Sequence, residues 1–263
     1  MSSVRTLKAI ILDMDGTIAD TEDIHRQAFN TAFDELKVSF HWRQKEYKQL
    51  LAISGGRERL RQYLLMHMTS SGRTESLLDL ADRLHDRKSE IYRQMLIDGH
   101  VGLRPGIRRL IHEAKAEGIT LAIATSSSAK NVETLLKVAL DEDALGLFST
   151  IVTCDTVIEK KPAAAVYLFV LNKLELDPRH CIALEDTRNG NLAAMGAGLK
   201  TVITTHLLTT DNDFTGAALV VDQLGEPDRP AGVISGSLFG QSYVDVNLLE
   251  QLLMPSDGLL MSG

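Results

Sequence analysis

Two hydrophobic patterns, one typical of strands and one typical of helices, alternate along most of the second half of the chain. The strand pattern also occurs near the start of the chain. Short runs of β-branched and other apolar residues, each closed by small or polar residues, lie at residues 8–12, 120–124, 151–153, 181–184 and 200–203. Segments with apolar residues at every third or fourth position, as helices have, lie at residues 107–116, 129–139, 163–174 and 189–195. This alternation predicts a doubly wound, Rossmann-like α/β fold, with a parallel sheet that binds ligands at the carboxyl ends of its strands.

A long helical stretch interrupts this alternation after the first apolar run. More than a hundred residues separate the first run from the second, which far exceeds a simple crossover. We therefore expect two domains, an α/β core of residues 1–20 and 101–263 and an inserted α-helical cap domain of residues 21–100. Apolar residues recur at helical spacing within the insertion at residues 22–36, 44–52, 57–67 and 74–95.

The end of the chain departs from both patterns. Residues 225–242 are rich in Gly, Pro and Ser, and we expect them to form a surface excursion. A short helix is expected after it, at residues 244–253.

Composition places the chain among ordinary globular proteins. Its 263 residues are 44% hydrophobic and 24% charged, which argues against collagen-like, disordered and disulfide-rich classes. The two cysteines, Cys154 and Cys181, are too few to staple a chain of this length or to form a zinc site by themselves. No apolar run approaches the ~18 residues of a membrane span, and the polar start does not resemble a signal peptide. We therefore expect a cytoplasmic protein with no membrane partner.

The distribution of charge changes this picture in one respect. With 28 Lys and Arg against 35 Asp and Glu, the chain carries a net charge of −7 and repels nucleic acid in bulk. The predicted cap holds 13 basic and 12 acidic residues, so the acidic excess lies in the core. Nucleic acid is therefore not an expected partner, and an anionic substrate would need a metal ion and well-placed cations.

The first apolar run ends in the strongest chemical motif, Asp13-Met-Asp15-Gly16-Thr17. Two carboxylates two residues apart, directly after a buried strand, can share a divalent cation and still have separate tasks. One can attack phosphorus as a nucleophile, while the other protonates the leaving oxygen and later deprotonates water. Gly16 permits a tight backbone path, and Thr17 offers a hydrogen bond to a phosphate.

A fragment of a calcium-binding loop is the competing interpretation of this motif. An EF-hand loop would use Asp13, Asp15 and Glu22 as its third, fifth and twelfth residues. Its first ligand would then be Ile11, which cannot bind calcium, and a strand precedes the motif where an EF-hand needs a helix. We therefore prefer the catalytic interpretation.

Three further polar groups follow later predicted strands, where the fold would bring them beside the first motif. Hydroxyl residues 125–128 close the second run, where they suit a phosphate oxygen or simply cap the next helix. Lys161 precedes Pro162, which we expect in the first turn of a helix, so the lysine would lie on a loop at the sheet edge. Glu185 and Asp186 close the fourth run, where they either cap a helix or complete a magnesium site.

In order and spacing, these four motifs resemble those of the haloacid dehalogenase-like hydrolases, and the insertion is similar to the helical cap of their phosphatases and mutases. The resemblance implies an enzyme that uses Mg2+ and forms an aspartyl phosphate. It implies Asp13 as the nucleophile, Asp15 as the general acid and base, and Lys161 as the cation that orients the nucleophile. The remaining implied roles are phosphate binding by Thr125 and Ser126, and metal binding by Asp13, the carbonyl of Asp15, Glu185 and Asp186.

The cap resembles one branch of this family, the CbbY type, in residues 21–25 and 53–61, and residues 213–216 and 224–227 of the core do so as well. The characterised members of that branch are phosphatases of xylulose 1,5-bisphosphate. Gly56 would let the backbone approach a ligand, and Arg57 could clamp a second, non-reacting phosphate. We expect Arg59 on a solvated helix face, and the same interpretation stays open for Arg61. The other candidate substrate contacts are Asp20, His25 and Tyr47, although a lone helical histidine is more often structural.

We therefore expect a monomeric, Mg2+-dependent phosphatase of a small phosphorylated sugar, a pentulose bisphosphate such as xylulose 1,5-bisphosphate. A sugar-phosphate mutase of the β-phosphoglucomutase type is the nearest alternative. A non-catalytic phosphosugar-binding protein is a weaker one, because such a protein would have lost Asp13, Asp15 or Lys161. Lys160 adds a second possible active-site cation next to Lys161.

Overall fold

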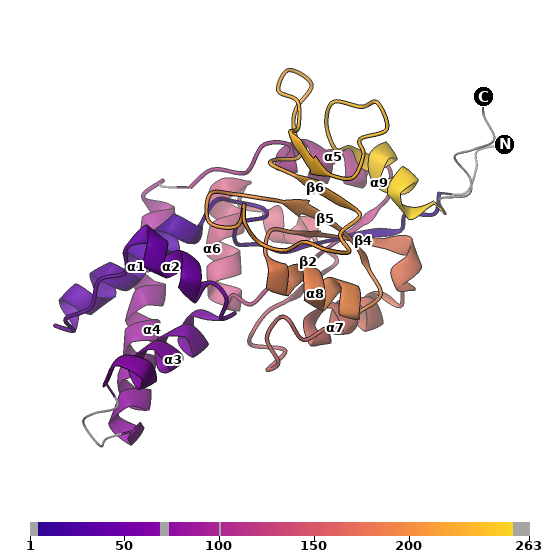
Figure 1. The fold of residues 1–263 in the computed structure, drawn as a ribbon. Helices are drawn as coiled ribbons and strands as arrows, with labels where there is room; N and C mark the ends of the chain where they lie inside the picture. The colour runs from indigo at the N-terminus through magenta and orange to yellow at the C-terminus, as the bar shows by residue number, and fades with distance from the viewer. Residues whose placement is uncertain (1–4, 69–73, 100, 255–263) are drawn as a thin grey trace.

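In residues 5–68, 74–99 and 101–254, which the computed structural model describes, a seven-stranded sheet forms the centre of the core (Figure 1). The strand order is β3-β2-β1-β4-β5-β6-β7, in which β7 is antiparallel to β6 and all other neighbours are parallel. The predicted doubly wound parallel sheet is thereby confirmed. The strands are β1 (Ala9–Leu12), β2 (Thr120–Ala124), β3 (Thr150–Val152), β4 (Cys181–Glu185), β5 (Lys200–Thr204), β6 (Leu219–Val221) and β7 (Val233–Ser235).

Successive side chains of each strand point to opposite faces of this sheet. In β1, Ile10 and Leu12 belong to the apolar cluster of α5, α6 and α9, whereas Ala9 and Ile11 belong to that of α7 and α8. Figure 1 shows α5 and α9 above the sheet and α7 and α8 below it. Both faces of the central strand are therefore covered, which explains its unbroken apolar sequence. The helices are α5 (Ile107–Ala116), α6 (Ala129–Ala139), α7 (Ala165–Leu174), α8 (Arg188–Gly196) and α9 (Val246–Leu253).

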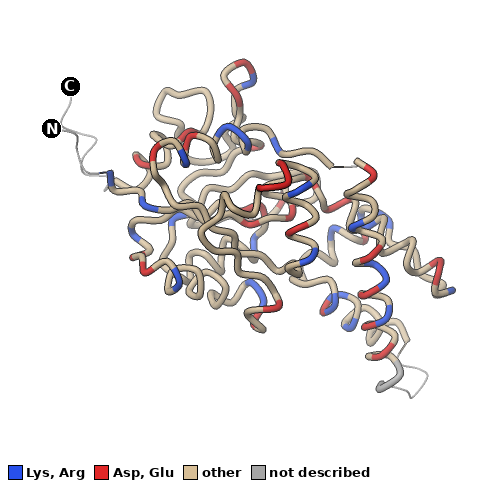
Figure 2. The backbone as a smooth tube through the Cα atoms, turned by 180° about the vertical axis from the view of Figure 1, so that it is seen from behind, with Lys and Arg blue, Asp and Glu red and all other residues tan. Residues whose placement is uncertain are grey.

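The cap lies to one side of the sheet and consists of α1 (Glu22–Glu35), α2 (Gln44–Leu50), α3 (Gly56–Met68) and α4 (Thr74–Ile97) (Figure 1). Its interior is aromatic: Phe29 lies 4.8 Å from Trp42 between ring centroids, and both are fully buried. Figure 2 shows basic and acidic residues interspersed along these helices, as a near-neutral cap requires. In the described part of the chain, no helix is long and apolar enough to cross a membrane.

The two linkers between cap and core run side by side. Ala19 in the outgoing linker forms an antiparallel bridge with Leu103 in the returning one. The backbone N–H of Arg104 donates to the carbonyl of Ile18 at 2.9 Å. The connection between the domains is therefore a paired segment of backbone that directly follows the motif of residues 13–17.

Two details differ from the sequence prediction. The short strands β6 and β7 were missed, and β7 lies within the predicted excursion of residues 225–242. The expectation that Pro162 lies in the first turn of a helix is wrong, because α7 begins at Ala165 and Pro162 lies in the preceding loop. Residue 100, at the predicted boundary of the cap, lies outside the described residues.

Candidate active site

The catalytic motif follows β1, which lies between β2 and β4 in the sheet. Leu12 pairs with Ile123 in β2 and with Leu184 in β4, so the three strands end at the same level. The residues that follow them meet at one edge: Asp13, the hydroxyl run after β2, and the acidic pair that closes β4. This is the edge where a doubly wound sheet binds its ligands.

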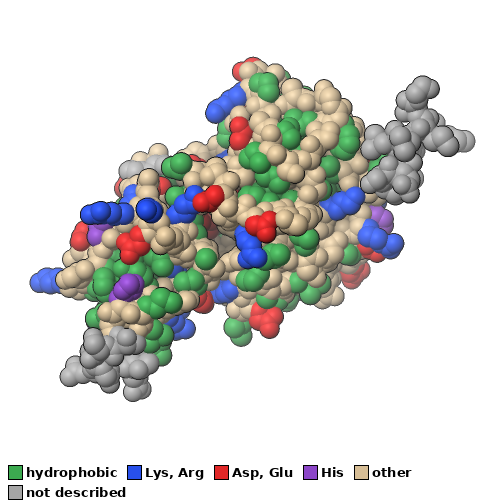
Figure 3. Space-filling model, in the orientation of Figure 1, with side chains coloured by type: hydrophobic (Ala, Val, Ile, Leu, Met, Phe, Trp, Pro, Cys, Tyr) green, Lys and Arg blue, Asp and Glu red, His purple; other side chains and the backbone are tan. Residues whose placement is uncertain are grey.

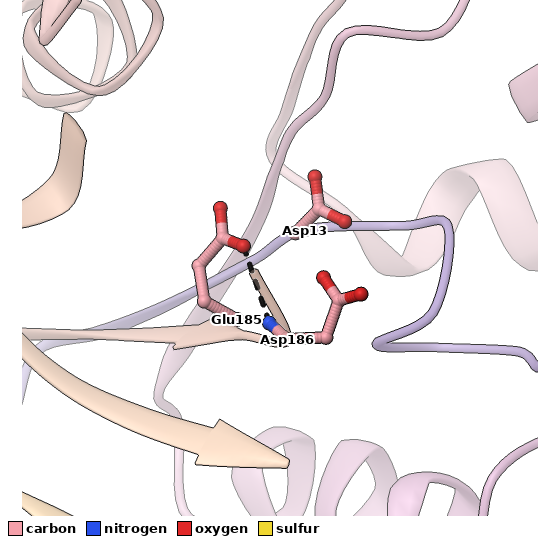
Figure 4. A group of neighbouring side chains, drawn as sticks. All are labelled: Asp13, Glu185 and Asp186. Atoms are coloured by element: carbon pink, nitrogen blue, oxygen red, sulfur yellow. Dashed lines mark hydrogen bonds between the residues drawn. The ribbon is translucent and has the colours of Figure 1, made fainter. Parts of the chain in front are cut away.

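Three buried carboxylates meet at this edge (Figure 4). Asp13, Glu185 and Asp186 each contribute one oxygen to a group whose members all lie within 4.8 Å of one another. In Figure 4 the carboxylates of Asp13 and Asp186 lie one above the other, and that of Glu185 stands apart and accepts a hydrogen bond from the Asp186 backbone at 3.2 Å. Carboxylate oxygens in such a group are the ligands that magnesium prefers.

Lys161 reaches this cluster from the loop before α7. Its ammonium lies 2.5 Å from Oδ1 of Asp13 and 2.5 Å from Oε1 of Glu185, and it donates to the carbonyl of Ala124 at 2.9 Å. Tyr167 in α7 donates a further hydrogen bond to Glu185 at 2.6 Å. Burial acts to lower the pKa of Lys161, but the adjacent carboxylates outweigh it and raise the pKa. The ammonium therefore stays charged beside Asp13.

One lysine does not neutralise three carboxylates. Burial raises the pKa of Asp13 well above its ordinary value, against the attraction of Lys161 and with the repulsion of the neighbouring acids. Burial also raises the pKa of Asp186 to about 6, although His206 lies 3.0 Å from its Oδ2. A divalent cation among these oxygens would remove the cost of keeping them charged. The residues present therefore fit a metal ion.

Asp15 directs its carboxylate toward the cap. Its Oδ1 accepts hydrogen bonds from Thr21 at 2.7 Å, from Nε2 of His25 at 2.9 Å and from Tyr92 at 3.1 Å, while its Oδ2 accepts from Ser127 at 2.5 Å. Burial acts to raise the pKa of Asp15, but His25 and the hydroxyl donors outweigh it and hold the pKa below its ordinary value. The two aspartates of one motif thus have separate partners.

A lysine in α4 extends the network around Asp15. Nζ of Lys88 lies 2.6 Å from Nδ1 of His25, and the ring of Tyr92 stacks on the imidazole with 3.9 Å between centroids. In its charged form Lys88 only donates, so Nδ1 then accepts and Nε2 carries the proton that is shared with Asp15. Burial lowers the pKa of His25 and also that of Lys88, the latter to about 7. Beside a charged Lys88, His25 is therefore a neutral donor to Asp15.

A cavity extends from the carboxylates into the cap. It opens to solvent between the two domains, and Figure 3 shows the surface hollowed where cap and core meet. Asp13 and Lys161 line it on the core side, and Arg59, His85 and Lys88 line it on the cap side. The cavity therefore presents basic side chains on both sides.

Arg59 is the arginine of α3 that lines this cavity, with an exposed fraction of 7%. The expectation that it lies on a solvated helix face is wrong. Its guanidinium donates to the carbonyls of Leu50 and Ile53 at 3.0 and 3.1 Å and to the hydroxyl of Tyr47 at 2.9 Å. The turn between α2 and α3 folds over this side chain and buries it.

Arg57 and Arg61 lie on a different side of α3. Arg57 pairs with Asp82 at 3.0 Å and with Asp86 at 2.9 Å, and Arg61 pairs with Asp82 at 2.9 Å. Of the sequence candidates in this segment, Gly56 lines the cavity, whereas the two arginines are not among its lining residues. Both guanidiniums are partners of α4 carboxylates.

The other cap candidates occupy three different environments. Tyr47 is fully buried and donates to Glu22 at 3.2 Å while accepting from Arg59, so it lies behind the cavity wall. Asp20 is exposed on the outgoing linker. Lys160 lines a second groove between cap and core and is not among the residues around Asp13.

Hydroxyl residues 125–128 fit both roles considered for them, capping of a helix and a place beside a bound phosphate. Ser128 is the N-cap of α6, where its Oγ accepts a backbone N–H. All four residues line the cavity. Thr125 is buried, and its Oγ1 accepts from the backbone of Ser127 at 3.1 Å. Helix capping and a place in the cavity wall therefore coexist in one run.

Sequence reasoning missed several residues of the site, because they belong to no motif of fixed spacing. The spacing of Lys88 and Tyr92, four residues apart on one face of a predicted helix, is the one sequence signal that could have indicated a pair. The missed residues are His85, Lys88, Tyr92, Tyr167 and His206.

Comparison with known proteins decides the family. The model for haloacid dehalogenase-like hydrolases matches residues 10–204. The chain belongs to this family. The plasmid-encoded protein CbbY of Cupriavidus necator is 42% identical over 85% of this chain and 88% of its own length. The crystal structure of a CbbY variant from Rhodobacter sphaeroides in complex with xylulose-(1,5)bisphosphate has a TM-score of 0.75 and 37% identity, covering 82% of this chain and 94% of that chain. A putative β-phosphoglucomutase from Thermotoga maritima has a TM-score of 0.59 and 26% identity over the same shares.

Membership of this family, together with the CbbY relatives, makes the chain a phosphatase. The predicted resemblance to the CbbY branch is confirmed, and so is the fold with a helical cap. The structure brings the residues that the resemblance singles out in the core to one edge of the sheet: Asp13, Asp15, Thr125, Lys161, Glu185 and Asp186.

Proposed function

We propose that the chain is a Mg2+-dependent phosphatase that hydrolyses a pentulose bisphosphate, such as xylulose 1,5-bisphosphate, through an aspartyl phosphate. The observation that carries this proposal is the cavity, with Asp13 and Lys161 on one side and Arg59 and Lys88 on the other. A sugar with two phosphates matches two groups of cations. The CbbY relative that binds xylulose bisphosphate supports this choice of substrate.

Asp13 is the nucleophile in this proposal. Lys161 holds Oδ1 at 2.5 Å, which leaves Oδ2 free to attack the phosphorus of the substrate. A new bond between Oδ2 and phosphorus forms while the bond between phosphorus and the sugar oxygen breaks. Lys161 at the same time supplies positive charge beside the transferred phosphoryl group, which stabilises charge on its oxygens.

Asp15 moves the proton. It protonates the departing sugar oxygen and then, as a carboxylate, takes a proton from the water that cleaves the aspartyl phosphate. Thr21, His25 and Ser127 fix both of its oxygens. Their hydrogen bonds favour the base form, and the negative charge of an arriving phosphate favours the acid form, so binding of the substrate prepares Asp15 for the first step.

Asp13, Asp186, Glu185 and the backbone carbonyl of Asp15 would hold the Mg2+ ion. When bound, the ion supplies positive charge that neutralises phosphate oxygens and favours the ionised form of Asp13. The raised pKa values of Asp13 and Asp186 support this assignment, because burial of both carboxylates calls for a compensating cation.

Arg59 binds the second phosphate in place of Arg57. Three of its five N–H groups are used within the cap, which leaves two for a ligand in the cavity. Arg57 is already paired with two carboxylates. Gly56 and Ser126 remain proposed substrate contacts because both line the cavity.

His25 and Tyr47 act in this proposal through other residues. His25 orients Asp15, and Tyr47 orients Arg59, through the hydrogen bonds described above. Asp20 and Arg61 are proposed at most as peripheral contacts, because neither lines the cavity.

A substrate panel tests the proposal. The wild-type enzyme is given mono- and bisphosphorylated pentoses and hexoses, and released phosphate is measured with Mg2+ and with EDTA. We expect the highest kcat/KM for a pentulose bisphosphate, loss of activity in EDTA and recovery with Mg2+. A preference for monophosphates would contradict the role of Arg59, and full activity in EDTA would contradict the metal site.

A sugar-phosphate mutase is the second candidate, favoured by the enclosure of Asp15 under the cap. Three cap-side groups, Thr21, His25 and Tyr92, surround its Oδ1, and a mutase must keep water from the aspartyl phosphate. Phosphate balance separates the two reactions. Release of free phosphate in proportion to the substrate consumed would exclude the mutase, and isomerised sugar phosphate without released phosphate would exclude the phosphatase.

A further inference from the structure

Arg104 is a buried arginine that lies outside the cavity, in the linker that returns from the cap. Its exposed fraction is 8%. Its guanidinium donates to three backbone carbonyls from distant parts of the chain: Gly16 at 2.9 Å, Thr205 at 2.7 Å and Asp222 at 2.8 Å. One side chain therefore connects the catalytic loop with the segments that follow β5 and β6.

Two of these carbonyls lie next to groups of the active site. Gly16 follows Asp15 and has a φ of +82°, and a side chain at this position would collide with the carboxylate of Asp186. Thr205 precedes His206, whose Nε2 lies 3.0 Å from Oδ2 of Asp186. The Arg104 guanidinium thus holds the backbone on two sides of the acidic cluster.

The backbone of Arg104 connects the same region to the cap linkers. Its N–H donates to the carbonyl of Ile18 at 2.9 Å, and the preceding Leu103 pairs with Ala19. Any displacement of the cap acts on these paired linkers. Arg104 is therefore the residue through which the linkers are tied to the core loops.

This arrangement is costly for the folded protein. Burial lowers the pKa of Arg104, and its Nε has no hydrogen-bond partner within the described residues. A buried, incompletely bonded cation costs stability that an apolar side chain would not. What this buried cation provides is its set of contacts to three separate loops, two of which border the acidic cluster.

We propose that Arg104 is a positioning residue for phosphoryl transfer, which keeps the turn at Asp15 and Gly16 and the segment of His206 in fixed relation to Asp186. This inference rests on the phosphatase activity and not on the identity of the sugar. Displacement of catalytic groups by about 1 Å costs about 100-fold in rate, so loss of the guanidinium affects kcat more than KM.

Arg109 provides a matched control. It lies in α5, is partly buried, and donates to the carbonyls of Gly225 at 2.8 Å and Val244 at 3.0 Å, away from the catalytic loop. We therefore compare Arg104→Ala with Arg109→Ala, using p-nitrophenyl phosphate as substrate at a temperature well below the Tm of each variant. Both variants are expected to lose thermal stability.

The expected difference lies in turnover. For Arg104→Ala, kcat falls about 100-fold while KM changes less than about threefold, and added methylguanidinium restores part of kcat. For Arg109→Ala, kcat stays within about twofold of wild type and does not respond to methylguanidinium. Wild-type kcat in Arg104→Ala, or an equal loss in both variants without rescue, would overturn the proposal.

A second pair of variants decides the question if the alanine variants do not fold. Arg104→Lys keeps the charge but carries its three N–H donors on one nitrogen, which cannot reach all the carbonyls that the two guanidinium nitrogens contact, so kcat falls by about tenfold, whereas Arg109→Lys retains wild-type kcat. Equal kcat in the two lysine variants would overturn the proposal. If the wild type cleaves p-nitrophenyl phosphate but no sugar bisphosphate, the proposed substrate fails and this comparison still stands.

Discussion

Asp13 and Asp15 are two residues apart, yet their carboxylates lie in opposite surroundings. Asp13 faces the core, where burial among Glu185 and Asp186 raises its pKa well above the ordinary value. Asp15 faces the cap, where His25 and hydroxyl donors outweigh burial and hold its pKa below the ordinary value. Among the protein groups alone, burial thus disfavours the ionised form of the proposed nucleophile, and hydrogen bonds disfavour the protonated form of the proposed acid.

The reaction needs the reverse order, and its ligands supply it. Positive charge beside Asp13 lowers the pKa of this carboxyl, and the negative charge of a phosphate raises that of Asp15. In the proposed reaction, a bound Mg2+ ion would therefore favour the ionised form of Asp13, and the phosphate of the substrate would favour the protonated form of Asp15.

Replacing the two carboxylates separately tests this comparison with the largest expected effect. Asp13→Asn abolishes turnover of every phosphate ester, because the amide cannot form an acyl phosphate. Asp15→Asn lowers kcat for a sugar bisphosphate by about 10²–10⁴-fold, because the leaving oxygen and the attacking water lose their proton carrier. The loss is smaller with p-nitrophenyl phosphate, whose leaving group needs no proton. Phosphate release and the intact mass of acid-quenched enzyme measure both results.

The mass measurement separates the two roles. A phosphorylated enzyme species is expected in Asp15→Asn and none in Asp13→Asn, while Asp177→Asn, at a half-buried position before β4, serves as a control with wild-type turnover. Retained activity in Asp13→Asn would refute the nucleophile. Equal loss with both substrates in Asp15→Asn would refute the proton carrier.

The core side of the site could be predicted from the sequence, because parallel strands in register determine where their ends meet. Asp13 and Asp186 follow adjacent strands, so the strand pattern predicts that they lie close together without any knowledge of side-chain packing. Lys161 required more, since it lies on a loop whose course the pattern does not determine. Its position on a loop at the sheet edge was inferred from Pro162 as a helix start, which was wrong, and its role beside Asp13 followed from the resemblance.

The cap residues that line the cavity could be predicted only in part from the sequence. Arg57 and Arg59 are two residues apart on one helix and therefore point to nearly opposite sides. Which of them faces the cavity depends on the turn between α2 and α3 and on the carboxylates of α4, and neither leaves a periodic signal. Strands β6 and β7 were missed as well, although β3 is equally short and was predicted.

The two arginines provide the second test, which addresses the cap alone. Arg59→Met is expected to lower kcat/KM for a pentulose bisphosphate by about 10–100-fold, because a charge-assisted hydrogen bond to the second phosphate is worth about 1.5–3 kcal/mol. Arg57→Met leaves kcat/KM within about threefold, because its guanidinium already pairs with two carboxylates at the protein surface. Steady-state kinetics with the bisphosphate measures both.

A substrate without a second phosphate distinguishes binding from damage to the cap. With p-nitrophenyl phosphate, Arg59→Met is expected to lose much less activity than with the bisphosphate, and Arg59→Lys is expected to recover part of the lost affinity. If both substrates lose activity equally, Arg59 supports the structure of the cap through Leu50 and Ile53 and does not bind phosphate. A large loss in Arg57→Met would return the phosphate clamp to that residue.

Lys88 provides the test with the smallest effect, a change in stability with pH in the metal-free enzyme. Burial lowers the pKa of Lys88 from 10.5 to about 7 in the folded protein. Below pH 7 both states hold the proton and the folded state bears the full cost of the buried charge. Between pH 7 and 10.5 the unfolded state binds more protons, so stability rises with pH, and above this window the cost of the buried charge is gone.

Lys88→Met is therefore expected to raise Tm relative to wild type by about 2–4 °C near pH 6 and by less near pH 10. Thermal unfolding in EDTA, with a variant of the exposed Lys45, Lys45→Met, as control, measures this difference. A change in Tm that is the same at both pH values would contradict the buried cation on the cap side of Asp15.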